Sequence, residues 1–186
     1  MNRKRTVFLF ILLVFCTYGF SQSVIDYKNK ALLKALQESS ITDFAQISEI
    51  GIDETIRDRY DIHGKFFETK SNISQYKYIY VGRVNSCRAG GCAISPGAPH
   101  NADSEYFDYF ILFDKNKTVQ FVQVFNYQAT HGHEICTKGW LKQFIGHNGT
   151  NPLQVNKNID TISGATISVY AITADVETKT ALLNSL

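Results

Sequence analysis

Residues 106–127 read YFDYFILFDKNKTVQFVQVFNY, and this stretch decides which kind of fold the chain adopts. Aromatic and β-branched residues fill its two outer runs, 106–113 and 118–127. The segment between them, Asp114–Lys117, is short and polar. Two such runs around a polar turn are typical of a β-hairpin. The sequence therefore predicts a pair of antiparallel strands here.

Further strands and helices are predicted around this hairpin. Two runs before it, Lys65–Thr69 and the alternating, aromatic Tyr76–Val81, have the pattern of strands. Apolar residues recur at helical spacing in Val24–Glu38 and again from about Ala165 to Leu183. We therefore expect an α+β fold, with a small antiparallel sheet containing a hairpin and flanked by N- and C-terminal helices.

The remaining segments have weaker patterns. Ser23 is the expected N-cap of the first helix. Ile41–Ile56 is ambiguous, with a hint of a second short helix. Cys87–Asp103 is rich in Gly and Pro, which predicts a loop. Gly139–Ile145 has the pattern of one or two helical turns, and the polar residues Gly146–Asn158 that of a loop.

The first 21 residues have the composition of a secretory signal peptide. Basic residues 3–5 precede an apolar run over residues 7–16, and the small residues Gly19 and Ser21 suit cleavage before Gln22. The apolar run is shorter than the ~20 residues that a membrane-spanning helix needs. The alternative is an uncleaved N-terminal anchor. We expect an exported protein with a single domain over residues 22–186.

Charge and length exclude several classes of function. The chain carries 19 basic and 17 acidic residues. Without Arg3, Lys4 and Arg5 of the predicted signal, 16 basic residues stand against 17 acidic ones, so the mature domain is near neutral. Because nucleic acid binding needs a basic surface, we expect no nucleic acid partner. With 186 residues, the chain is also too short for a reductase that has separate cofactor and substrate domains.

The segment Asp160–Ser168, with the sequence DTISGATIS, carries the most informative chemistry. Its small residues allow another group to approach the backbone closely. It leads into a predicted helix, whose N-terminus has a partial positive charge that suits a phosphate. Ser163, Thr166 and Ser168 add hydroxyl groups. Taken alone, the residues are compatible with a phosphate-holding turn and also with ordinary helix capping by Ser163 or Thr161.

The pattern DxxSGATxS over residues 160–168 resembles the flavinylation motif of the FMN-binding domain family. Members of this family include the covalent-flavin subunits of the sodium-translocating NADH:quinone reductase and of the Rnf electron-transport complex. The resemblance extends to the hairpin and to the segment WxxQF over residues 140–144, which is similar to one that the family has between its hairpin and the motif. It departs from the family in the loops at 87–103 and 130–134.

The resemblance implies a covalent cofactor. In the family, the motif's final Thr carries FMN through a phosphoester bond, and a dedicated flavin transferase makes the attachment. The corresponding residue here is Thr166. Asp160 is then expected to be recognised by the transferase. The expected FMN-binding residues are Thr166, Ser163, Gly164, Ala165, Asp160 and Ser168.

The resemblance also implies a role in electron transport. The family's flavin domains face the outside of the cytoplasmic membrane, so the expected location is the periplasm or that outer face. The expected partners are membrane or extracytoplasmic redox proteins. Because a flavin passes one or two electrons and no pair of residues stands out for acid–base chemistry, we expect an electron carrier rather than an enzyme that acts alone on a small substrate.

Cysteine and histidine residues define the alternative function. Cys87, Cys92 and Cys136 follow the predicted signal, and export favours a disulfide between two of them. His131 and His133, beside Cys136, are expected as exposed loop residues, but together with the cysteines they have the ligand types of a metal or redox thiol site. The alternative is therefore an exported thiol- or metal-binding module on the same fold, without flavin.

Overall fold

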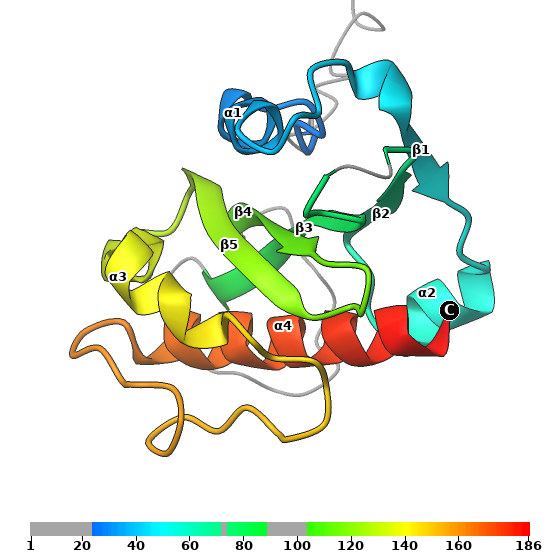
Figure 1. The fold of residues 1–186 in the computed structure, drawn as a ribbon. Helices are drawn as coiled ribbons and strands as arrows, with labels where there is room; N and C mark the ends of the chain where they lie inside the picture. The colour runs from blue at the N-terminus through cyan, green and yellow to red at the C-terminus, as the bar shows by residue number, and fades with distance from the viewer. Residues whose placement is uncertain (1–23, 72–73, 89–103) are drawn as a thin grey trace, which may run out of the picture.

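The computed structural model describes residues 24–71, 74–88 and 104–186. A five-stranded sheet has helix α1 over one face and helix α4 across the other (Figure 1). In chain order the elements are α1 (Lys30–Gln37), η1 (Phe44–Gln46), β1 (Ile47–Ile50), α2 (Glu54–Arg59), β2 (Gly64–Thr69), β3 (Tyr78–Arg88), β4 (Ser104–Phe113), β5 (Val119–Tyr127), η2 (His133–Cys136), α3 (Lys138–Leu141), η3 (Lys142–Phe144) and α4 (Thr166–Ser185). This arrangement confirms the predicted α+β class.

Two predictions fall on residues outside the described ranges. They are the signal peptide over residues 1–21 and most of the Gly- and Pro-rich loop before the hairpin. Among the helices that the structure describes, none combines the length and the apolar character needed to cross a membrane.

The sheet is an antiparallel meander in the order β1-β2-β3-β4-β5, because each strand pairs with the next one in the chain. The predicted hairpin is confirmed as β4 and β5. Its turn is closed by the carboxylate of Asp114, which accepts hydrogen bonds from the backbone N–H groups of Asn116 and Thr118 at 2.8 and 2.9 Å. Lys117 completes the turn with a φ of 59°.

Both faces of the sheet are buried, which explains why β4 is apolar along almost its whole length. Phe107, Tyr109 and Ile111 lie in the core on the side of α4. Phe110 and Leu112 alternate with them and lie in a second core, on the side of α1. Side chains of a strand point alternately to the two faces, so a strand covered on both sides is apolar at most of its positions.

Helix α1 begins six residues later than its predicted start. Asn29, rather than Ser23, is its N-cap, and the Asn29 side chain accepts a hydrogen bond from the backbone N–H of Leu32 at 2.9 Å. Before the helix, the carboxylate of Asp26 accepts a bond from the N–H of Lys28, and the Asn29 amide donates to the carbonyl of Asp26. These local bonds give the backbone an alternative to helix over residues 26–29.

The ambiguous segment Ile41–Ile56 contains a strand as well as short helices. Residues Ile47–Ile50 form β1, which pairs with β2 at the edge of the sheet. Helix α2 follows, with Asp53 as its N-cap; Asp53 accepts a bond from the N–H of Thr55 at 2.8 Å. Hydrogen bonds from Thr55 lower the pKa of Asp53, so the cap is ionised at neutral pH. The hint of a second short helix rested on Phe44, Ile47 and Ile50. Phe44 begins the short helix η1, but Ile47 and Ile50 lie in β1, so the hint was wrong for this strand.

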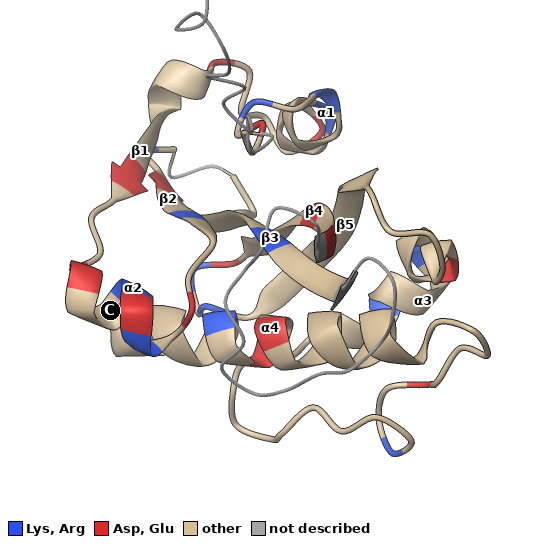
Figure 2. Ribbon diagram, turned by 180° about the vertical axis from the view of Figure 1, so that it is seen from behind, with Lys and Arg blue, Asp and Glu red and all other residues tan. Residues whose placement is uncertain are grey.

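Helix α4 buries the apolar stripe that the sequence predicts. Val169, Ile172 and Val176 are fully buried against the sheet, where α4 packs on β3. Figure 2 shows that α2 and α4 each carry acidic as well as basic residues. The expected absence of a nucleic acid partner is not tested by this pattern and stays a prediction.

Candidate functional site

The motif segment before α4 is an exposed loop that lies between two buried residues. Ile159 is 1% exposed and Ala165 is 2% exposed, whereas Asp160, Ser163 and Gly164 between them are exposed. The N–H of Ala165 donates to the carbonyl of Ile162 at 3.0 Å, which turns the chain into the helix. The segment is thus fixed at its two ends and open to solvent in between; we call residues 160–164 the motif bow.

Gly164 and Thr166 stand where the bow meets α4. Gly164 has a φ of 82°, a conformation that favours glycine, and a Cβ placed there would have no heavy atom within 4 Å. Thr166 is the first residue of α4 and is exposed. Ala165 occupies the N-cap position, and no side chain in the described part of the chain caps the helix. Capping by Ser163 or Thr161 is therefore not what the structure shows.

The segment WxxQF holds the backbone of Asp160. The indole N–H of Trp140 donates to the carbonyl of Asp160 at 2.9 Å. The side-chain oxygen of Gln143 accepts from the N–H of Asp160 at 2.8 Å. Trp140 itself is 8% exposed and packs edge-on against Phe144, as expected for a core residue. Two stretches that the sequence singled out separately therefore meet at the start of the motif bow.

Ser168 points inward and belongs to a chain of hydroxyl groups. Its Oγ lies 2.7 Å from Oγ of Ser86 and 3.0 Å from the hydroxyl of Tyr127. Tyr127 donates its only proton to the carbonyl of His131. Ser168 must then donate to Tyr127, and Ser86 to Ser168. Burial raises the pKa of Tyr127 above its ordinary value, which keeps this hydroxyl protonated. The role of Ser168 toward FMN stays a prediction.

The turn at His131–His133 packs closely on the start of α4. Gly132 has a φ of 89°, and a Cβ there would lie 2.8 Å from Oγ of Ser168 and 2.9 Å from the hydroxyl of Tyr127. Only glycine fits this position without displacing the hydroxyl chain. The ring of His133 meets Tyr127 edge-on at 5.3 Å. This turn, where the sequence departs from the family, therefore lies beside the motif.

The alternative function, a thiol or metal site, rests on cysteine and histidine residues, and the structure describes the side chains of three of them: Cys136, His131 and His133. Cys136 is a free, half-buried thiol, and burial raises its pKa to about 11. His131 and His133 are exposed, as expected for loop histidines. Cys92 and the side chain of Cys87 lie outside the described part, so the disulfide stays a prediction. Within the described part, no group of three or more His, Cys, Asp or Glu residues could hold a metal ion.

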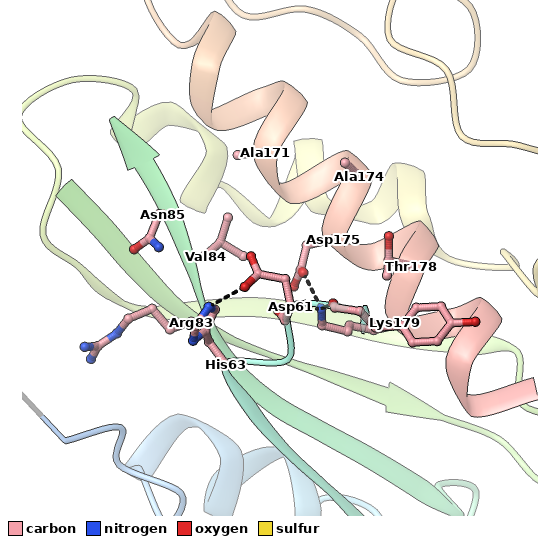
Figure 3. Close-up of a pocket in the computed structure, with 11 residues that line it drawn as sticks. Asp61, His63, Arg83, Val84, Asn85, Ala171, Ala174, Asp175, Thr178 and Lys179 are labelled. Carbon is pink, nitrogen blue, oxygen red and sulfur yellow. Dashed lines mark hydrogen bonds and ion pairs between the residues drawn. The ribbon is translucent and has the colours of Figure 1, made fainter. Parts of the chain in front are cut away.

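A separate cleft of about 310 Å³ lies along the flank of α4, between this helix and β3 (Figure 3). Two polar contacts line it: a hydrogen bond between Asp61 and His63 and an ion pair between Asp175 and Lys179, each at 2.8 Å. No residue of the motif is among those described as lining the cleft. The cleft and the exposed hydroxyl of Thr166 are therefore two different features of the same helix.

Comparison with known families gives a match over part of the chain. A family model described as the FMN-binding domain matches residues 106–179. The match starts in β4 and ends within α4, so it includes the hairpin, the WxxQF segment and the motif. This match agrees with the resemblance seen in the sequence: residues 106–179 are similar to the FMN-binding domain family. The match supports flavin binding, with FMN as the cofactor.

A comparison with curated proteins found no match.

Three residues near the motif were not anticipated from the sequence. Ser86 and Tyr127 hold Ser168, and Gln143 holds Asp160. Tyr127 closes the predicted hairpin, and Ser86 stands just before the Gly- and Pro-rich loop. Of these three residues, only Gln143 could have been found from the sequence, because it is a fixed position of the WxxQF segment.

Proposed function

We propose that the chain carries FMN covalently on Thr166, through a phosphoester bond to the side-chain oxygen. The observation that carries this proposal is the exposed hydroxyl of Thr166 at the first residue of α4. The preceding turn is slim and open, because nothing approaches the position of a Cβ at Gly164. A hydroxyl presented in this way is accessible to the active site of another enzyme. The residue types therefore fit a covalently attached phosphate group.

Attachment requires an activated donor. The Thr166 oxygen forms a bond to the phosphorus of the flavin phosphate, the bond from phosphorus to the leaving group breaks, and the hydroxyl proton passes to the solvent or to that group. A flavin dinucleotide, with AMP as the leaving group, supplies the phosphoanhydride bond that makes the transfer favourable. A Thr hydroxyl is not acidic, so the modifying enzyme, a flavin transferase, must supply the base.

Other residues of the motif have supporting roles in this proposal. Asp160 offers an exposed carboxylate that the transferase recognises. Ser163, Gly164 and Ala165 form the turn that leads to Thr166. Backbone N–H groups near Ile167 and Ser168, at the positive end of a 20-residue helix, favour a phosphate on the neighbouring side chain.

The bound flavin supplies one- and two-electron redox chemistry, which the protein tunes and exposes. We infer a carrier that relays electrons between membrane or extracytoplasmic redox partners. We infer that the predicted signal peptide exports it to the periplasm or to the outer face of the cytoplasmic membrane. The composition of residues 1–21 and the family's usual location support this placement.

The test is intact mass and peptide mapping after co-expression with a flavin transferase. We expect a gain of one FMN less one water on the peptide that contains Thr166, and no gain in Thr166→Ala. The matched control is Thr150→Ala, which removes an exposed hydroxyl in the loop before the motif and should load fully. Full loading of Thr166→Ala contradicts the proposal. An unmodified wild-type chain, with the transferase active on a control protein, favours the thiol- or metal-binding alternative.

A further inference from the structure

The backbone of Asp160 is held from both sides. Its N–H donates to Gln143 at 2.8 Å, and its carbonyl accepts from Trp140 at 2.9 Å. The amide of Gln143 also donates to the carbonyl of Trp140 at 3.1 Å, which ties the two holding residues together. The peptide planes on both sides of Asp160 are therefore fixed, while its side chain is exposed.

The holding residues are themselves rigidly placed. Trp140 is 8% exposed and lies in the core on the side of α4, next to Phe144, which is fully buried. Just before the motif bow, Ile159 is buried in the same core, and just after it Ala165 is buried there too. The bow is therefore an exposed segment whose starting direction is set by the core.

Rigidity matters for a segment that another enzyme has to bind. Ordering a flexible backbone costs roughly 1–2 kcal/mol per residue. A segment that is already ordered avoids this cost when it enters an active site, so it binds more tightly. The exposed surface of the bow contains the carboxylate of Asp160 and leads directly to Thr166, the acceptor in the proposed function. Hydrogen bonds to backbone atoms hold the bow without occupying either side chain.

We propose that Gln143 and Trp140 are positioning residues, which present Asp160–Thr166 as a preformed substrate segment to the flavin-transferring enzyme. They act through the backbone of Asp160 and do not touch the flavin donor. The inference rests on the proposed attachment at Thr166. It adds an interaction surface, the motif bow, and the residues that determine its conformation.

Three variants of the full chain test this proposal. Gln143→Met keeps the size of the side chain and removes the acceptor for the N–H of Asp160. Gln143→Glu keeps an oxygen acceptor at the same place. The matched control, Asn184→Ala, removes a comparable bond at the other end of α4, where the Asn184 amide donates to the carbonyl of Asn148 at 2.8 Å. Transfer rates are measured with flavin adenine dinucleotide as donor and a purified flavin transferase, alongside thermal unfolding.

The expected result is a rise of about fivefold in the KM for the Gln143→Met protein, as one lost hydrogen bond predicts, with kcat unchanged. Gln143→Glu and Asn184→Ala should have KM values close to that of the wild type. Gln143→Met and Asn184→Ala should unfold at similar temperatures. A fall in stability alone does not produce this pattern, because the conservative variant restores the KM.

Two outcomes overturn the inference, and they are distinguishable. If wild-type protein gains no flavin on the Thr166 peptide, the proposed function fails and the inference fails with it. If wild-type protein is loaded and Gln143→Met has the wild-type KM, only the inference fails. Equal losses in Gln143→Met and Gln143→Glu also overturn it, because the acceptor oxygen is then not what matters.

Discussion

The two ends of helix α4 are held in different ways. At the N-terminal end, Ser168 is bound by the neutral hydroxyls of Ser86 and Tyr127, and Thr166 is exposed. Toward the C-terminal end, the ammonium group of Lys179 is buried and pairs with Asp175 at 2.8 Å. One end rests on neutral bonds and the other on a buried charge. Because a buried charge that loses its partner is costly, we expect the C-terminal end to be the more sensitive of the two to a single substitution.

The charged end is completed by groups from two other elements. Lys179 also donates to the carbonyls of Tyr60 and Asp61, at 3.2 and 3.4 Å. Asp175 accepts a bond from the hydroxyl of Tyr109 at 2.6 Å. Burial and then the charge of Asp175 raise the pKa of Tyr109 well above its usual value, so this hydroxyl stays a donor. Figure 3 shows the Asp175–Lys179 pair in the cleft between α4 and β3.

The largest expected effect is from Lys179→Met. This change removes the cation and leaves Asp175 and two backbone carbonyls without their partner. Breaking a buried pair in this way costs about 3–5 kcal/mol. Urea denaturation should show a loss of this size in the free energy of unfolding. Lys157→Met, at an exposed loop position, should change it by no more than about 0.5 kcal/mol. Similar values for the two variants contradict the comparison.

A smaller effect is expected from Ser168→Ala at the other end. The change removes two neutral bonds and leaves the hydroxyls of Ser86 and Tyr127 without that partner, at a cost of about 1–3 kcal/mol. The control on the same helix is Ser185→Ala, which removes a bond to the carbonyl of Leu182 near the end of α4. Its effect should be within about 0.5 kcal/mol. Urea denaturation of both variants measures the difference, and a cost for Ser168→Ala above that for Lys179→Met reverses the order proposed.

The smallest effect on the free energy of unfolding is expected from Cys136→Ala, close to the hydroxyl chain. Burial raises the pKa of its thiol from 9.0 to about 11, so the folded state retains the proton more firmly than the unfolded state. The resulting stability is fully present below pH 9 and is lost as the pH rises toward 11. The gap in unfolding free energy between wild type and Cys136→Ala should therefore narrow over this range.

Alkylation of Cys136 provides an independent measurement. At pH 8, iodoacetamide should modify Cys136 in the native protein roughly a hundredfold more slowly than in the urea-unfolded protein, because the thiolate is the reactive form. The modified residue is identified by peptide mapping. Equal rates in the two states contradict the raised pKa.

The sequence predicted the parts of the fold that have long, regular patterns. The hairpin and α4 have enough apolar residues in register for their type to be evident. Strand β1 has only four residues, and its pairing with β2 decides its conformation. The start of α1 was placed too early, because Ile25 fits the helical spacing while Asp26 and Asn29 form local bonds that oppose a helix.

For the candidate site, the sequence identified the motif but not what holds it. The bonds to Asp160 involve its backbone atoms, which every residue has, so no choice of residue at position 160 indicates them. The inward direction of Ser168 depends on Ser86, a residue of a distant strand. Small and polar residues predicted an accessible segment, and the structure adds that this segment has a fixed conformation.

The sheet and the start of α4 differ in the sequence separation of the residues that contact each other. Neighbouring strands are consecutive in sequence, whereas the bond between Ser86 and Ser168 joins residues 82 positions apart. Contacts between distant residues are entropically costly to form before the segments between them are ordered. We therefore expect α4 to dock only after the sheet has folded. If the motif bow is recognised only in its docked form, a misfolded chain escapes modification, and the attached flavin marks the molecules that have folded correctly.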